Sequence, residues 1–196
     1  MSGYLPGVWN RFLEVKALLI HIWSPPVGAF REGDVLMVLD AIRAYESLFD
    51  MRQRLSLERL VKTARGKGIP IVFTRWKRVD KSRDDAVDAK GHWSDYVPLD
   101  ETSLLVVPEK EDIVADVFFT NAFSSDVVCE AIKDKRRLVL AGGWLESCVT
   151  DTARVSMQRD MDVSVVVKSA TVGHSWMWYF SWVTLQMLYA NVVSGM

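Results

Sequence analysis

The chain has 196 residues, of which 49% are hydrophobic and 25% charged, and its formal net charge is -1 at pH 7. These values are typical of an ordinary globular protein, and the length fits a single domain over residues 1–196. The near-neutral charge and the lack of any run of five basic residues argue against a nucleic-acid partner.

The first apolar run, VKALLIHIW, is shorter than the roughly twenty residues of a membrane span and is followed by Pro25-Pro26. It also lacks the small-residue cleavage site of a signal peptide. The two cysteines, Cys129 and Cys148, form neither a disulfide framework nor the spacing of a zinc site. We therefore expect a cytoplasmic protein without a membrane partner.

Short β-branched runs alternate with helical patterns along the chain. The expected strands cover residues 16–22, 69–75, 111–119, 136–143 and 162–170, with a short last strand near Val192. Apolar residues at helical spacing lie in residues 35–49, 57–64 and 127–132. This alternation predicts an α/β fold of three layers, a doubly wound and mostly parallel sheet of about six strands with helices on both faces. Ligands of such sheets bind at the carboxyl ends of the strands.

The segment LVLAGGWLESCVTDTA carries the most chemical information. A strand ends at Gly142-Gly143, and Cys148 follows in or near the first turn of a helix. Free backbone N–H groups and the helix dipole favour a thiolate there, and the same N–H groups can hold an oxyanion. A lone cysteine is as commonly a small buried hydrophobe, so both readings stay open. Cys129, inside a helical pattern, is expected to be structural.

Several motifs, in this order, resemble the isochorismatase-like hydrolases, a cysteine-hydrolase superfamily that includes the nicotinamidases. KALLIHIW resembles the first strand of that family, EDIVADVFFTNAF the third, and LAGGWLESCVTDTA the fourth strand and nucleophile turn. The similarity extends over nearly the whole chain. It implies a triad in which an aspartate after the first strand takes the thiol proton, a lysine after the third stabilises charge, and the cysteine attacks an amide carbonyl.

Carried over by position, the cysteine of the triad falls on Cys148, the lysine on Val117 and the aspartate on Ile22. In a second register, VLMVLDAIRAYES is the first strand and Asp40 is the aspartate. The helical spacing of residues 35–49 and the strand-like ALLIHIW favour Ile22. The expected triad is therefore divergent, with two of its polar members replaced by apolar residues.

Other polar groups could supply acid or base chemistry. Besides Asp40, the candidates are His174, which follows the fifth expected strand, and Glu146, two residues before Cys148. A lone histidine is more often structural, and Glu146 is equally a favourable charge near a helix N-terminus. The expected substrate pocket is lined by His21, Ile22, Trp23, Trp93, Val117, Phe118, Phe123, Trp144 and Leu145. Such a lining suits a flat or apolar small molecule.

No metal or cofactor is expected, because TRWKRVD after the second expected strand lacks the histidine of the metal-binding relatives. The aromatic closing helix predicts a subunit interface and hence a homo-oligomer. Two function classes remain. One is an enzyme that acts on a small, apolar or aromatic molecule through Cys148, and the other is a catalytically degenerate module that binds a small molecule or a protein.

Overall fold

The structure is a computed structural model that describes residues 30–76, 103–173 and 177–194. Its centre is one sheet of six strands, which are β1 (Asp34–Leu39), β2 (Ile71–Trp76), β3 (Ile113–Val117), β4 (Arg137–Gly142), β5 (Asp162–Ala170) and β6 (Asn191–Val193). Every neighbouring pair is parallel, in the order β3-β2-β1-β4-β5-β6. The strand order reverses between β1 and β4, which makes their carboxyl ends the switch point of the sheet.

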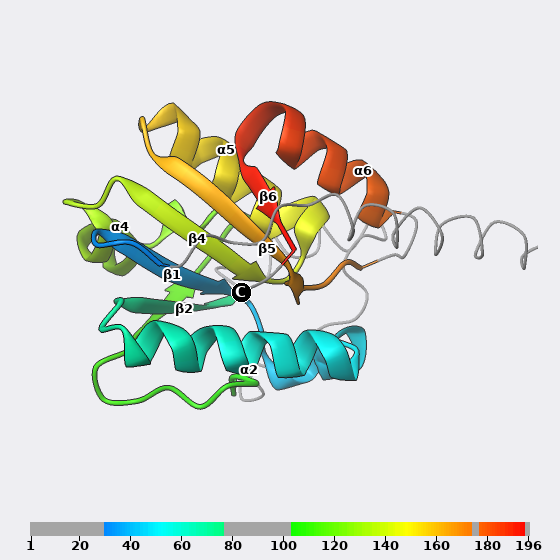
Figure 1. Ribbon diagram of the computed structural model, residues 1–196, viewed down its shortest axis with the longest axis horizontal. Helices are drawn as coiled ribbons and strands as arrows, with labels where there is room; N and C mark the ends of the chain where they lie inside the picture. The colour runs from blue at the N-terminus through cyan, green and yellow to red at the C-terminus, as the bar shows by residue number, and fades with distance from the viewer. Residues whose placement is uncertain (1–29, 77–102, 174–176, 195–196) are drawn as a thin grey trace, which may run out of the picture.

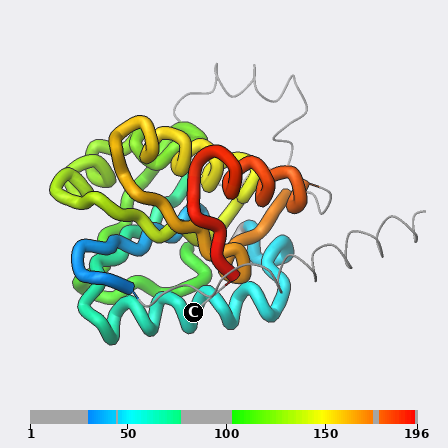
Figure 2. The backbone as a smooth tube through the Cα atoms, turned by 45° about the horizontal axis from the view of Figure 1, so that its top comes forward, coloured from blue at the N-terminus to red at the C-terminus, as the bar shows by residue number. Residues whose placement is uncertain are grey.

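Helices cover both faces of the sheet, as the sequence predicted (Figure 1). They are α2 (Met51–Gly66), α4 (Asp126–Ile132), α5 (Thr150–Gln158) and α6 (Met177–Thr184), with the short helical turns η1 (Arg43–Leu48), η2 (Ala122–Ser124), η3 (Leu145–Val149) and η4 (Leu185–Tyr189). Helix α2 packs on one face, and α4, α5 and η4 contribute to the core on the other. The same three layers are visible in the tilted view of Figure 2. No helix in the described ranges is long and apolar enough to cross a membrane.

Helix α2 begins and ends where its sequence signals lie. Asp50 caps it by accepting a hydrogen bond from the N–H of Gln53 at 2.7 Å, and the Gln53 side chain accepts one from the N–H of Asp50 at 2.8 Å. This reciprocal capping box stabilises a helix start. The helix ends before Gly68, whose positive φ of 66° favours glycine. Leu57, Leu60, Val61 and Ala64 are buried from it, which confirms the helix predicted there.

The helix expected from the spacing of residues 35–49 is wrong. Residues Asp34–Leu39 form β1, and only the short turn η1 follows. All six residues of β1 are buried, because the strand lies in the middle of the sheet with a helical layer on each face. A strand buried on both faces lacks the alternation of polar and apolar residues, so its apolar run does not distinguish period two from helical spacing.

The first strand of the described sheet is thus β1, which ends directly before Asp40. The register that placed the family aspartate at Ile22 is wrong, because Asp40 stands at the carboxyl end of the central strand. Ile22 itself, with the rest of the strand expected at 16–22, lies outside the described residues. The other expected strands are confirmed as β2 to β6.

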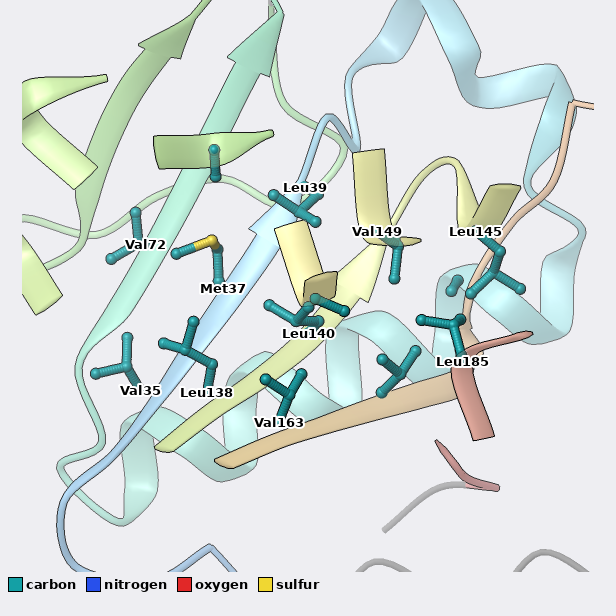
Figure 3. Packing of buried hydrophobic residues seen from close by; sticks show 14 of the residues in the cluster. Val35, Met37, Leu39, Val72, Leu138, Leu140, Leu145, Val149, Val163 and Leu185 are labelled. Atoms are coloured by element: carbon teal, nitrogen blue, oxygen red, sulfur yellow. The ribbon is translucent and has the colours of Figure 1, made fainter. Parts of the chain in front are cut away.

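The core on the α5 face holds the nucleophile turn in place. Figure 3 shows Leu145 and Val149, on either side of Cys148 in the chain, packed beside Leu140 and Leu185. Leu145 and Val149 are fully buried. Burying a leucine or valine side chain contributes about 1.5–3 kcal/mol, so these two residues fix the turn by packing.

Candidate active site

The site is built where the ends of β1 and β4 meet. Leu39 pairs with Gly142 across the two strands, and the N–H of Gly143 donates to the carbonyl oxygen of Leu39 at 2.8 Å. Gly142 has a φ of 102°, and a Cβ there would lie 2.0 Å from the same carbonyl oxygen. Only glycine fits this approach. It brings Asp40 beside the turn that carries Cys148.

Asp40 is a buried carboxylate held by hydrogen bonds from three directions. Its side chain is 3% exposed, and its φ of 46° turns the chain sharply at the strand end. The Thr74 hydroxyl donates to Oδ1 at 2.9 Å, and the backbone N–H of Trp76 and the thiol of Cys148 also bond the carboxylate. Burial outweighs these bonds and raises the pKa of Asp40 from 3.8 to about 6.

Cys148 lies in the π-helical turn η3, immediately before α5, and is 7% exposed. The turn follows a cis peptide bond between Gly143 and Trp144. Burial first, then the charge of Asp40 and the hydrogen bond to it, raise the pKa of Cys148 well above 9. Hydrogen bonds from the Trp144 backbone and the Ser147 side chain act in the opposite direction.

The free thiol is therefore protonated at neutral pH, whereas the sequence analysis expected the helix N-terminus to favour a thiolate. Burial disfavours the charged form of the thiol, and the neighbouring carboxylate disfavours a second negative charge. Together these two effects outweigh the helix dipole. The arrangement is that of an acid and a base sharing one proton. Above pH 6 the Asp40 carboxylate can accept the thiol proton, and the thiolate is the nucleophilic form.

Tyr45, which lies within the helical spacing described for residues 35–49 in the sequence, also belongs to this site. Burial and the charges of Asp40 and Cys148 raise its pKa well above the usual value. Its ring lies 5.4 Å from the ring of Trp144, tilted by 50°. The sequence signal for Tyr45 was its position five residues after Asp40. That position points to the site only in the register in which Asp40 is the family aspartate, and the helical spacing disfavoured that register.

The structure separates the predicted pocket residues into groups. Trp144 lies at the site through its contacts with Tyr45 and Cys148. Val117 and Leu145, predicted to line the pocket, have side chains that are 2% and 0% exposed and belong to the core. Phe118 is 37% exposed at the end of β3. The residues His21, Ile22, Trp23, Trp93 and His174 lie outside the described ranges.

Phe123, also predicted to line the substrate pocket, lies beside Arg159 and Cys129. The guanidinium of Arg159 lies 4.3 Å from its ring centre. Phe123 and Arg159 line a cavity of about 510 Å³ together with Cys129. The structure therefore places Phe123 beside Cys129, which belongs to α4. Phe123 contributes to the packing of α4 against the end of α5.

The Glu146 side chain contacts the loop after β5. Its Oε1 accepts a hydrogen bond from the N–H of Gly173 at 2.6 Å. The side chain thus ties the nucleophile turn to that loop, which is a positioning contact. Within the described ranges, no three His, Cys, Asp or Glu side chains gather into a possible metal site.

Comparison with known proteins decides the family. The model of the isochorismatase domain matches residues 50–195, about three quarters of the chain, including Cys148. The chain belongs to the isochorismatase domain family. The resemblance seen in the sequence motifs is thereby confirmed. No curated protein matches the chain.

Solved structures of isochorismatase-like proteins share the fold of this family member. An isochorismatase from Pseudomonas putida has a TM-score of 0.66 and 18% identity, over 90% of this chain and 94% of its own. A pyrazinamidase/nicotinamidase from Streptococcus mutans has a TM-score of 0.66 and 16% identity, over 82% and 99%. The N-carbamoylsarcosine amidase from Thermoplasma acidophilum has a TM-score of 0.66 and 18% identity, over 82% and 95%. At these identities the likeness shows the fold alone.

Proposed function

We propose that this isochorismatase-family protein is a cysteine hydrolase in which Asp40 and Cys148 cleave a C–N bond of a small molecule. The observation that carries the proposal is the hydrogen bond between the buried Asp40 carboxylate and the Cys148 thiol at the switch point of the sheet. A carboxylate with a pKa of about 6 is a base matched to neutral pH, and it lies in contact with the proton it removes.

The reaction proceeds in two halves. Asp40 takes the thiol proton, the sulfur of Cys148 bonds to the carbonyl carbon of an amide, and negative charge passes to the carbonyl oxygen. The C–N bond then breaks, and the leaving nitrogen receives the proton from Asp40. Water, deprotonated by Asp40, attacks the thioester, which releases a carboxylic acid and restores the thiol.

The surroundings of the dyad support a small, apolar or aromatic substrate. Tyr45 and Trp144 present two aromatic rings beside the sulfur. Val117, at the position where the resemblance implies a lysine, is buried in the core. Ligand sites of this kind are mostly apolar with a few placed polar groups.

The test is ammonia release from a panel of neutral primary amides, aromatic and aliphatic, measured with the wild type and three variants. Asp40→Asn and Cys148→Ala should lose turnover, whereas Cys129→Ala should retain it. For nicotinamide we expect a rate below roughly one per second, since the position of the family lysine holds Val117. Undiminished turnover by Cys148→Ala would contradict the proposal.

A second candidate is a binding module that has lost catalysis. The protonated, buried thiol of Cys148 favours it, because such a thiol has little intrinsic reactivity. This function predicts that a panel compound raises the melting temperature of the wild type and of Cys148→Ala equally, with no ammonia released from any compound.

We also propose that the protein forms a homo-oligomer. Phe180 on α6 and Met187 and Leu188 on η4 are 60%, 75% and 56% exposed. An apolar surface of this kind at the closing helix is typical of a contact between subunits. Sedimentation velocity of the wild type and of Phe180→Asp tests it, since the charged variant should shift the protein to a smaller species.

A further inference from the structure

Tyr45 is held over the site by the segment that follows β1. Its N–H donates to the carbonyl of Ile42 at 3.0 Å. The start of this segment is fixed to residues 103–105, because the N–H of Arg43 donates to Ser103 and the N–H of Leu105 donates to Ala41, both at 2.7 Å. These bonds fix the backbone that leads to Tyr45.

The ring of Tyr45 is placed by Trp144, a residue of the nucleophile turn. The two ring centres are 5.4 Å apart, and the Trp144 backbone bonds the sulfur of Cys148. Tyr45 is only half-buried, so part of the side chain is open to a ligand that approaches the sulfur. Its hydroxyl is close enough to Asp40 and Cys148 to interact with the charge of each.

The charge of the dyad defines what this hydroxyl can do. Above pH 6 the pair Asp40 and Cys148 holds one negative charge and one proton. During the reaction that charge passes from the carboxylate to the sulfur and then to the substrate oxygen. A phenol that stays protonated can donate a hydrogen bond to an oxygen that gains charge, and it brings no charge of its own.

We propose that the Tyr45 hydroxyl donates a hydrogen bond to the carbonyl oxygen of the substrate and, as a neutral donor beside an anionic dyad, selects uncharged amides over anionic compounds. This proposal deepens the proposed function, on which it rests for the reaction. The position of the family lysine cannot supply a donor, because Val117 has none and is buried in the core. Tyr45, whose hydroxyl interacts with the charges of Asp40 and Cys148, supplies a donor instead.

The proposal is tested by alkylation, which needs no knowledge of the substrate. Iodoacetamide and iodoacetate have the same shape, and only the second carries a negative charge. With either reagent the sulfur bonds to the methylene carbon and iodide leaves, and the thiol proton passes to Asp40 at Cys148 and to solvent at Cys129. The rates at Cys148 and Cys129 are followed separately by peptide mass spectrometry at pH 7.5.

Cys129 is an internal control with the opposite surroundings. Nη1 of Arg159 lies 3.9 Å from its sulfur, so a cation faces this thiol. We expect the ratio of the iodoacetamide rate to the iodoacetate rate to be at least tenfold higher at Cys148 than at Cys129. Equal ratios at the two cysteines would overturn the selection for uncharged compounds.

The hydroxyl itself is tested with Tyr45→Phe, which keeps the ring against Trp144. Iodoacetamide should react roughly 2- to 10-fold more slowly with Cys148 in this variant, the effect of one hydrogen bond, and at the wild-type rate with Cys129. Tyr179→Phe, on α6, is the matched control and should leave both rates unchanged. An unchanged rate at Cys148 in Tyr45→Phe overturns the proposal, whether or not amides are hydrolysed. If no amide is hydrolysed but Tyr45→Phe is slow, the hydrolase function fails and the donor role stands.

Discussion

The carbonyl oxygen of Leu39 accepts a hydrogen bond from the N–H of Gly143 at 2.8 Å. This bond joins the end of β1, one residue before Asp40, to the turn that leads to Cys148. The base and the nucleophile come from separate segments about a hundred residues apart in the chain. Their distance depends on how closely these two backbones approach.

Gly142→Ala should disrupt that approach. A Cβ at this position would lie 2.0 Å from the Leu39 oxygen, in a backbone conformation that alanine rarely adopts. We expect a loss of about 3 kcal/mol or more in the free energy of unfolding, measured by urea denaturation. Gly66→Ala is the matched control, because nothing lies within 4 Å of its Cβ position and it ends α2. It should be neutral or stabilising by up to about 1 kcal/mol. Equal effects of the two substitutions would contradict the close approach.

Thr74→Val should alter the titration of Asp40. The Thr74 hydroxyl donates to the carboxylate at 2.9 Å and accepts from the N–H of Asp40 at 3.2 Å. Without the donor, the ionised carboxylate is less stable, so its pKa rises further above 6. The acid limb of the pH–activity profile should move to higher pH, and the buried N–H left without its acceptor should cost about 1–3 kcal/mol. Thr74→Ser, which keeps the hydroxyl, should show neither change.

Glu146→Gln and Glu146→Ala together separate a positioning role from a role as base. Oε1 accepts the hydrogen bond from Gly173, and glutamine retains an oxygen for it. We expect glutamine to keep most of the turnover, and alanine to lower the melting temperature and to reduce turnover. Loss of turnover in both variants, with the glutamine variant as stable as the wild type, would instead identify Glu146 as a proton acceptor.

The fold was predictable from the sequence wherever local signals agreed. Asp162–Ala170 forms β5 with the predicted bounds, and the helical spacing predicted over residues 57–64 lies within α2. The strand β1 was predicted only in the register that we disfavoured, because burial on both faces removes the alternation of polar and apolar residues. Two apolar runs, 16–22 and 34–39, competed for one place in the sheet, and only the pairing of β1 with β2 and β4 resolves it.

The site was predictable only in part, for a related reason. Cys148 could be found from its strand, turn and helix, which are contiguous in sequence. Its raised pKa could not, because the causes are its burial and the charge of Asp40, which lies 108 positions earlier in the sequence and is brought close by the pairing of β1 with β4. Tyr45 depends on the same pairing. An error in assigning β1 therefore also misplaces Asp40 and Tyr45, the site residues that follow this strand.

Asp40→Asn should change how stability depends on pH. The pKa of Asp40 is about 6 in the folded protein and 3.8 when unperturbed, so the folded state binds this proton more tightly. The contribution to stability is fully present below pH 3.8 and is lost as the pH rises through 6. A shift of about two units corresponds to about 3 kcal/mol. From pH 4 to pH 7, urea denaturation should show the wild type losing up to that amount relative to the variant. A difference independent of pH would contradict the raised pKa.

The same substitution should change the pH dependence of Cys148 alkylation, measured with iodoacetamide in a Cys129→Ala background. Between pH 6 and the raised pKa of Cys148, the wild-type pair shares one proton, so the fraction of thiolate is set by transfer to Asp40 and does not change with pH. In Asp40→Asn the proton must go to solvent, so the rate should rise about tenfold per pH unit.

The two alkylation profiles should therefore coincide at low pH and diverge at higher pH. Asparagine resembles the protonated carboxyl group, so the microscopic pKa of the thiol is similar in the variant and in the wild type with Asp40 protonated. The fractions of thiolate are then nearly equal below the pKa of Asp40, about 6. Below this pH the two proteins should react at the same rate, and above it Asp40→Asn should react increasingly faster while hydrolysing no amide. Parallel profiles would show that Asp40 and Cys148 do not share a proton, and the two would then have to be treated as independent groups.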